Sequence, residues 1–158
     1  MSIRHSVKAI LIRDGRILLN RCVRRDGSTY FDLPGGGQKL YESKAATLIR
    51  EVQEETGYLV RPLRFAATAE EIYQDLAMRE KYPDYTHRLF SIYLAELIGG
   101  EQQAPAEPDF ATLGSEWVSL SALPDLPAVL PLGIKEALPR ILAGEIVDLG
   151  TISMDWKE

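Results

Sequence analysis

The chain has 158 residues, of which 46% are hydrophobic and 26% charged, a composition typical of a globular protein with one domain. Its formal net charge of −5 argues against a long nucleic-acid interface, because such an interface needs a basic face. No apolar stretch approaches the roughly 20 residues of a membrane helix, and Lys8 interrupts the apolar start. Cys22 is the only cysteine, so no intrachain disulfide can form, and we expect a cytoplasmic protein.

The first half of the chain is predicted to form a hairpin, a loop and a helix. Two β-rich runs flank Asp14-Gly15, a dipeptide that favours a hairpin turn. A polar loop, 24–29, then leads to the sequence YFDLP and to three consecutive glycines. From Ser43 the apolar residues recur at i, i+3, i+4 and i+7, and Gly57 is expected to end the helix in a left-handed conformation. The predicted buried stripe consists of Ala45, Leu48, Ile49 and Val52.

The second half is predicted to be mostly strands, followed by one more helix. One or two strands are expected in 58–73 and another in 86–98, with a polar stretch between them. A loop rich in Gly, Pro and acidic residues, 99–114, precedes a short strand at 115–120 and a helix at 132–142. The tail is left open between a strand and a loose end. This order of strands, helix, strands and helix predicts mixed α/β layering.

The helix that begins after Ser43 carries three carboxylates on one side. Glu51, Glu54 and Glu55 stand at i, i+3 and i+4, and each like-charged pair costs roughly 0.2–0.5 kcal/mol on an exposed helix. A bound cation would offset that cost, and hard oxygen ligands suit Mg²⁺ or Mn²⁺. Arg50 is expected either to brace Glu54 or to pair with Glu42.

The glycine triplet precedes this helix. Gly35, Gly36 and Gly37 allow the main chain to approach a ligand, so that a carbonyl could bind a metal ion and amides could meet phosphate oxygens. Neither GxxxxGK followed by Ser or Thr nor GxGxxG is present. Alone, an acidic helix face is usually only solvated and a glycine triplet usually only a turn. Their combination indicates a site.

The same residues resemble a known motif. Gly36, five residues, Glu42, seven residues, and then REVQEETGY, 50–58, match the Nudix box, GX5EX7REUXEEXGU, at every fixed position. Tyr58 stands where an aliphatic residue is usual, Lys39 where an acid is common, and Tyr41 where glycine is common.

The resemblance implies a single Nudix domain over 1–158, with its box at 36–58 and an α/β/α sandwich around a mixed sheet. It implies an enzyme that hydrolyses a phosphoanhydride bond in a nucleoside diphosphate linked to another moiety, with Mg²⁺ or alternatively Mn²⁺ as cofactor. By position, the implied metal ligands are Glu51, Glu54, Glu55 and the carbonyl of Gly35, while Arg50 orients a glutamate and Glu42 supports the loop. Many Nudix proteins dimerise, so the resemblance allows a homodimer.

The general base and the substrate contacts are less fixed by the motif. Glu54 is the first choice for the base, with Arg50 and Glu51 as the other catalytic residues, and Glu101 or Glu107 in the loop as alternatives. The expected partner is a small phosphorylated substrate such as a nucleotide or a nucleotide sugar. The candidate contacts to it are Gly36, Gly37, Arg21, Arg25 and Tyr73, although a solvated strand end or a salt bridge is the commoner role for each arginine.

Two rivals to the hydrolase stay open at this point. One is a Nudix-fold sensor that binds a nucleotide without cutting it, and the other is a structural domain whose acidic face is only solvated. The intact box acids favour the hydrolase. No subfamily mark around the box decides which nucleoside diphosphate derivative is the substrate.

Overall fold

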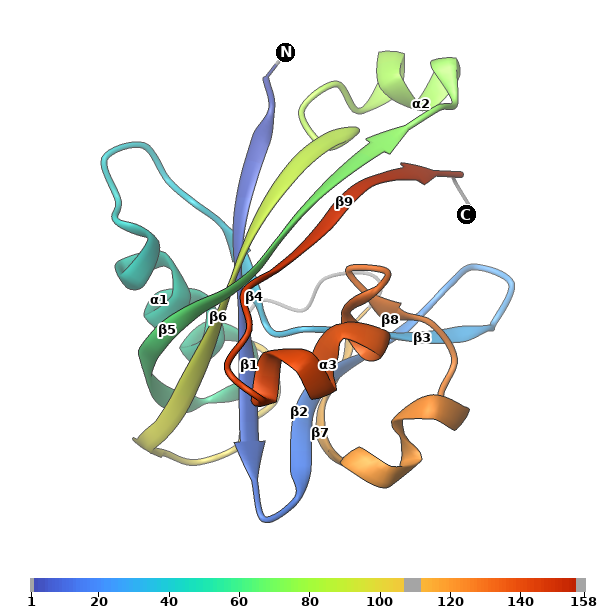
Figure 1. Ribbon diagram of the computed structural model, residues 1–158. Coiled ribbons are helices and arrows are strands. Elements are labelled where there is room, and N and C mark those ends of the chain that lie inside the picture. Colours follow the sequence, from blue (N-terminus) through green and yellow to red (C-terminus); the bar gives the residue numbers. More distant parts are fainter. Residues whose placement is uncertain (1, 107–111, 156–158) are drawn as a thin grey trace.

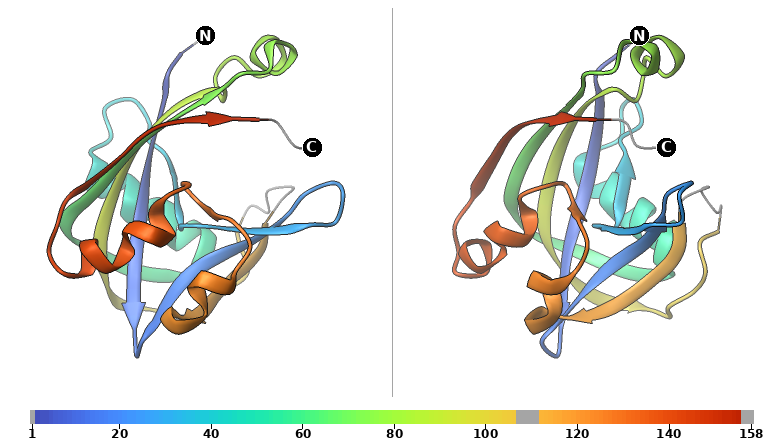
Figure 2. Two further views of the ribbon diagram at one scale, coloured as in Figure 1. Left: turned by 45° about the vertical axis from the view of Figure 1, so that its right-hand side comes forward. Right: turned by 90° about the vertical axis from the view of Figure 1, so that its right-hand side faces the viewer.

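The computed structural model describes residues 2–106 and 112–155, which form a curled mixed β-sheet with helices on both sides (Figures 1 and 2). The strands are β1 (Arg4–Arg13), β2 (Arg16–Val23), β3 (Thr29–Asp32), β4 (Gly35–Gly37), β5 (Tyr58–Tyr73), β6 (His87–Gly100), β7 (Thr112–Ser119), β8 (Val129–Leu130) and β9 (Val147–Met154). The helices are α1 (Lys44–Thr56), α2 (Leu76–Lys81) and α3 (Ile134–Leu142), with a 3₁₀ helix, η1 (Leu120–Asp125).

The sheet contains both strand directions. Its order is β8-β3-β2-β1-β6-β5-β9, with β4 also paired to β1 and β7 also paired to β2. Strands β1 and β6 run parallel, as do β5 and β9, whereas the β1–β2 hairpin and the long β5–β6 pair are antiparallel. The hairpin turns at Asp14-Gly15, as the sequence predicts.

A separation between β1 and β2 makes room for the glycine strand. The two strands pair only beside their turn, where Ile12 faces Ile17 and Arg13 faces Arg16. Further from the turn, in the N-terminal half of β1, residues 6–8 pair instead with the three glycines of β4. The chain then turns into α1, so that the glycines and the acidic helix are neighbours in space.

Two hydrophobic cores lie on opposite faces of the sheet. Leu48 and Val52 of α1 pack on one face against a cluster that includes Val7, Ala9 and Leu11. Helix α3 packs on the other face, and its buried residues are Ile134, Ala137, Leu138 and Ile141. Successive side chains of β1 point to alternate faces, so the same strand serves both cores. The arrangement confirms the predicted α/β/α sandwich (Figure 2).

Helix α1 begins and ends as predicted, but its buried stripe is displaced from the prediction. The Ser43 hydroxyl caps the first turn by accepting from the Ala46 amide at 3.1 Å, and Gly57 closes the helix with φ 81°. Ala45 is exposed, so its assignment to the core was wrong. Ile49 is half-buried, so its assignment to the core was correct only in part. Thr47 and Thr56 are buried instead.

Local hydrogen bonds explain why threonines can take those buried positions. The Thr47 hydroxyl donates to Glu42 Oε1 at 2.7 Å, and the Thr56 hydroxyl donates to the Val52 carbonyl at 2.6 Å. A buried hydroxyl with a partner avoids most of the cost of leaving water. Apolar spacing alone could not reveal this, since it treats threonine as polar.

The other differences from the sequence prediction lie at short or paired elements. Helix α2 lies inside the stretch predicted only as polar, and β7 begins at Thr112, within the predicted loop. The tail, left open from the sequence, forms β9 parallel to β5. Within the described ranges, no helix is long and apolar enough to cross a membrane.

Candidate active site

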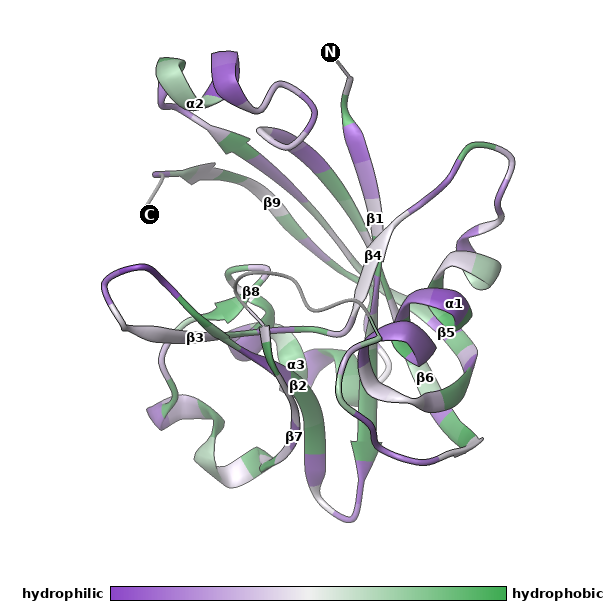
Figure 3. Cartoon of the chain, turned by 180° about the vertical axis from the view of Figure 1, so that it is seen from behind, coloured by the Kyte–Doolittle hydropathy of each residue, from purple (hydrophilic) through white to green (hydrophobic). Residues whose placement is uncertain are grey.

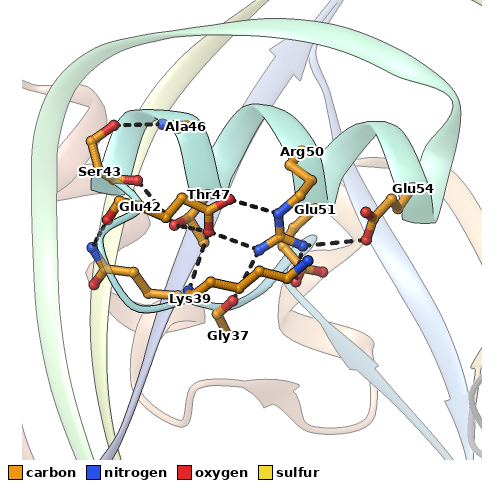
Figure 4. A network of polar contacts seen from close by, with 10 residues as sticks. Gly37, Lys39, Glu42, Ser43, Ala46, Thr47, Arg50, Glu51 and Glu54 are labelled. Carbon is orange, nitrogen blue, oxygen red and sulfur yellow. Dashed lines mark hydrogen bonds and ion pairs between the residues drawn. The ribbon is translucent and has the colours of Figure 1, made fainter.

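Arg50 is the centre of a polar network on α1 (Figure 4). Its Nε and Nη2 donate to the two carboxylate oxygens of Glu42, each at 2.8 Å. Its Nη1 donates to Glu51 Oε1 at 2.8 Å and to Glu54 Oε2 at 3.4 Å. Its Nη2 also donates to the Gly37 carbonyl at 3.1 Å. Arg50 therefore makes both of the contacts that the sequence left as alternatives.

Glu42 links the loop before α1 to this network. Hydrogen bonds from Arg50 and then from Thr47 lower the pKa of Glu42 from 4.5 to about 2. The Lys39 amide adds a hydrogen bond to Oε1 at 3.2 Å. The hydrogen bond to Glu42 is also the largest cause that raises the pKa of Arg50. The pair is therefore charged at any pH near neutrality.

Two glycines of β4 are required for different steric reasons. A Cβ at Gly35, whose φ is 140°, would overlap the Val7 carbonyl oxygen at 2.0 Å. A Cβ at Gly36 would lie 2.4 Å from Glu51 Oε2. Gly35 thus allows β4 to pair with β1, whereas Gly36 leaves the space that the Glu51 carboxylate occupies.

Glu55 turns inward from the helix, away from the Arg50 network. Its Oε2 accepts from Asn20 Nδ2 at 2.7 Å and from the Gly35 amide at 3.0 Å. Burial raises the pKa of Glu55 from 4.5 to about 7, against the opposing effects of the Lys8 charge and these two hydrogen bonds. Its Oε1 has no hydrogen-bond partner in residues 2–106 or 112–155.

Lys8 of β1 is paired with Gly35 of the glycine strand. The sequence did not identify it as a site residue. Its Nζ is 3.2 Å from Asp32 Oδ2, 3.1 Å from the Leu33 carbonyl and 3.5 Å from the Gly35 carbonyl. Burial would lower the pKa of Lys8, but the charges of Asp32 and Glu55 outweigh that effect and raise it.

Lys8 and Asn20 share a signal that could have identified them. Each is a polar residue inside a strand, each directly follows a buried apolar residue, and each is itself buried. A buried polar group needs a partner, so its position predicts a contact with another polar group. The sequence could not show that the partners would be Glu55 and the chain around Gly35.

The three carboxylates lie on one stretch of α1 but have different partners. Glu51 and Glu54 bind Arg50, whereas Glu55 binds the β2–β4 region. In the part of the chain that the structure describes, no three carboxylate, imidazole or thiol groups form a metal site by themselves. The predicted convergence is thus limited to a shared helical segment. Part of α1 has the purple colour of hydrophilic residues in Figure 3.

The available donors still fit a small hard cation. Mg²⁺ and Mn²⁺ prefer oxygen ligands, and this part of the chain offers carboxylate oxygens and the Gly35 carbonyl. The Gly36 position lacks a side chain where one would displace Glu51, and the Oε1 of Glu55 has no hydrogen-bond partner among the described residues. These features suit a site completed by water and substrate rather than a closed cage of protein ligands.

The predicted substrate contacts are spread over other elements. Arg21 is exposed on β2, and Arg25 is exposed in the turn between β2 and β3. Tyr73 is buried at the end of β5, where its hydroxyl lies 3.5 Å from Nη2 of Arg88, which in turn pairs with Glu71 at 2.5 Å. Gly37 contacts Arg50 through its carbonyl. Substrate roles for these residues stay predictions.

The loop that could supply an alternative base runs along the end of α1. The Gln103 amide donates to the Thr56 carbonyl at 2.8 Å, and the Ala106 amide donates to the Glu54 carbonyl at 2.9 Å. Glu101 is exposed at the start of this segment. Glu107 lies outside the described residues.

Comparisons with known proteins agree with this geometry. The model of the NUDIX domain matches residues 3–141, so the chain belongs to the NUDIX family. The expectation of a Nudix-type hydrolase of acid anhydrides is thereby confirmed at the level of the family. A search of the curated proteins gives no match.

Several solved structures share the fold. A NUDIX hydrolase from Nitrosomonas europaea is 19% identical with a TM-score of 0.69, and the match covers 94% of each chain. An ADP-ribose pyrophosphatase from Streptococcus suis is 24% identical with a TM-score of 0.60, over 96% of this chain and 100% of that one. A UDP-X diphosphatase is 17% identical with a TM-score of 0.64, over 94% of this chain and 68% of that one. At these identities the likeness concerns the fold.

Proposed function

We propose that the protein is a Mg²⁺-dependent hydrolase that cleaves a phosphoanhydride bond in a nucleoside diphosphate linked to another moiety. The observation that carries this proposal is the Arg50 network. One guanidinium group contacts the carboxylates of Glu42, Glu51 and Glu54 and the carbonyl of Gly37. A solvated acidic face would not need such a bridge to the glycine strand.

The residues that would hold Mg²⁺, or alternatively Mn²⁺, are Glu51, Glu54, Glu55 and the carbonyl of Gly35. When bound, the cation would neutralise phosphate oxygens and lower the pKa of a bound water. Arg50 contacts the carboxylates of both Glu51 and Glu54, and its positive charge offsets their mutual repulsion. Lys8 donates to the same Gly35 carbonyl through its Nζ at 3.5 Å.

Glu54 suits the role of general base that accepts the proton of the attacking water. Its side chain is 52% exposed, and its one hydrogen bond in the described part of the chain is the 3.4 Å contact with Arg50. Glu55, in contrast, is committed to Asn20 and Gly35 through Oε2. We infer that Glu55 serves as a fixed ligand while Glu54 moves the proton.

The substrate class is proposed as a small nucleotide derivative, in keeping with the net charge of −5 and with the family. Two of the solved neighbours are described as an ADP-ribose pyrophosphatase and a UDP-X diphosphatase. ADP-ribose and UDP-sugars are therefore the first compounds to test. The single cysteine, buried on β2, is compatible with the cytoplasmic location that we propose.

The test is a substrate panel with millimolar Mg²⁺, scored by phosphate release after coupling to a phosphatase. The panel contains ADP-ribose, UDP-sugars, dinucleoside polyphosphates, dNTPs, oxidised dGTP and capped RNA. We expect one class to be turned over, and Glu54→Gln to reduce kcat by about 10²-fold or more without unfolding.

Glu145→Gln is the matched control, because Glu145 pairs only with exposed Arg140 in the described chain and should leave kcat unchanged. Full turnover by Glu54→Gln would contradict the assignment of the base. Tight nucleotide binding with no turnover of any compound would instead favour the sensor.

A further inference from the structure

Asn20 is the only asparagine in the chain, and it lies on the buried side of β2 together with apolar residues. Its neighbours Leu18, Leu19 and Cys22 are buried, and Asn20 itself is only 5% exposed. Packing alone would be served by a leucine at this position. A buried amide costs free energy unless hydrogen bonds compensate it, so its presence needs a reason.

The amide nitrogen of Asn20 is directed at Glu55. Its Nδ2 donates to Glu55 Oε2 at 2.7 Å, and the only other donor to that oxygen in the described residues is the Gly35 amide at 3.0 Å. Both bonds end on the same oxygen. Glu55 is therefore held by one edge of its carboxylate, and its Oε1 is left for another partner.

The rest of the environment supports a positional role. Asn20 Oδ1 is buried and has no hydrogen-bond partner in the described part of the chain, so the bond to Glu55 is the one polar contact that its side chain makes there. The backbone at Asn20 pairs with Asp32 of β3 on one side and with Ser115 of β7 on the other. A residue paired on both sides is a rigid support for a long glutamate side chain.

We propose that Asn20 is a positioning residue that sets the affinity of the site for a divalent cation. By holding Oε2, it presents the free Oε1 of Glu55 to the ion. The inference rests on the proposed function in that it requires a metal site at Glu55. Asn20 lies outside the Nudix box, and its link to the site is visible only in the folded chain.

The test measures Mn²⁺ binding without substrate, from the electron paramagnetic resonance signal of unbound Mn²⁺. Loss of a hydrogen-bonding partner behind a metal ligand typically weakens metal affinity about 10- to 100-fold, and we expect this range for Asn20→Leu. Cys22→Ala is the control, because Cys22 is equally buried two residues further along β2. It should change the Mn²⁺ dissociation constant by less than about 2-fold.

A second pair of variants separates positioning from a general effect on the fold. If Asn20 acts through Glu55, then Asn20→Leu should change Mn²⁺ affinity by no more than about 2-fold when Glu55→Gln is already present. If the fold-loss of Mn²⁺ affinity in the double variant equals the product of the losses in the two single variants, Asn20 acts independently of Glu55. The proposal would then be wrong.

The outcomes also distinguish this proposal from the proposed function. Unchanged Mn²⁺ affinity in Asn20→Leu, or no Mn²⁺ binding by the wild type, overturns the role of Asn20. If the Mn²⁺ affinities follow the expected pattern but the protein hydrolyses none of the panel, the proposed hydrolase function is wrong. The positioning role of Asn20 would then still hold. If circular dichroism shows that Asn20→Leu is unfolded, Asn20→Ser removes the same donor with a smaller side chain.

Discussion

Gly36 and Gly99 differ in what a single methyl group would meet. A Cβ at Gly36 would lie 2.4 Å from Glu51 Oε2, whereas the nearest atom at Gly99 would be Leu59 Cδ2 at 3.8 Å. Neither glycine has the positive φ that disfavours other residues. Alanine at each position therefore tests the available space without straining the backbone.

We expect Gly36→Ala to lower kcat/KM by about 10- to 100-fold, because the methyl group displaces a carboxylate that the Arg50 network holds in place. The free energy of unfolding should fall by less than about 1 kcal/mol, because the displaced atoms are the flexible end of a side chain. Gly99→Ala should change neither quantity. Steady-state kinetics and chemical denaturation measure both, and wild-type activity of Gly36→Ala would contradict the assignment of Glu51.

The sequence indicates the spacing of the candidate site residues, but not the directions of their side chains. The spacing of Glu51, Glu54 and Glu55 is visible in the sequence, and so is the proximity of Arg50 to Glu54. The inward turn of Glu55 is not, because it depends on Asn20, which is 35 positions away in the chain. Helical geometry fixes which side of the helix a residue occupies, whereas contacts across the fold fix where its charged group points.

Among the larger elements, the segment 101–106 explains the one departure at the end of the Nudix box. This segment lies against the last turn of α1, where its amides bind the carbonyls of Glu54 and Thr56. Tyr58 connects this segment to β7. Its hydroxyl accepts from Trp117 Nε1 at 3.0 Å and donates to Gln102 Oε1 at 3.3 Å. An aliphatic residue at this position could make neither bond.

Tyr58→Phe removes only this hydroxyl. We expect it to lower the free energy of unfolding by about 1–3 kcal/mol, because Trp117 Nε1 and Gln102 Oε1 lose a partner. The amides of Gln103 and Ala106 should exchange with solvent faster, since the segment is then held less firmly. Thermal denaturation and hydrogen exchange measure these effects.

The matched control for this variant is Tyr93→Phe. Tyr93 makes the same kind of edge contact, with Phe65 at a centroid distance of 5.6 Å, as Tyr58 makes with Trp117 at 5.8 Å. No hydrogen bond of its hydroxyl occurs among the described residues, so its removal should leave stability and exchange nearly unchanged. Equal effects of the two variants would show that the hydroxyl of Tyr58 does not fasten the segment.

Elements that carry their own signals were predicted, and those that depend on distant pairing were not. Helix α1 has a cap at each end and an apolar stripe, and the first hairpin has its turn dipeptide. Helix α2 has only six residues, too few to show a helical period. Strand β9 exists through parallel pairing with β5, which no local pattern in the tail could indicate.

At the scale of the whole molecule, the burial of Glu55 makes stability depend on pH. The pKa of Glu55 rises from 4.5 to about 7 on folding without a metal, so the folded state holds its proton more tightly than the unfolded chain does. The free energy of unfolding therefore falls as the pH rises from 4.5 towards 7. A pKa shift of this size lowers the free energy of unfolding by on the order of 3 kcal/mol. The decrease is complete once the pH is above the pKa of Glu55 in the folded state.

A divalent cation would reverse that loss, because it binds the ionised carboxylate and not the protonated one. Mg²⁺ at 100 times its dissociation constant stabilises a folded protein by about 2.7 kcal/mol, which raises Tm by about 5–10 °C for a chain of this size. We expect this increase at pH 8 and much less of it at pH 5.5.

Glu55→Gln separates this effect from all other titrations. The variant should be more stable than the wild type at pH 8 without Mg²⁺, since it buries no charge, and its Tm should respond little to Mg²⁺ at either pH. The difference in Tm between wild type and variant, followed by calorimetry from pH 4.5 to 8, isolates the contribution of Glu55. A difference that stays constant over this range would show that Glu55 does not change its protonation there. A Mg²⁺ response equal at both pH values would show that the cation binds elsewhere.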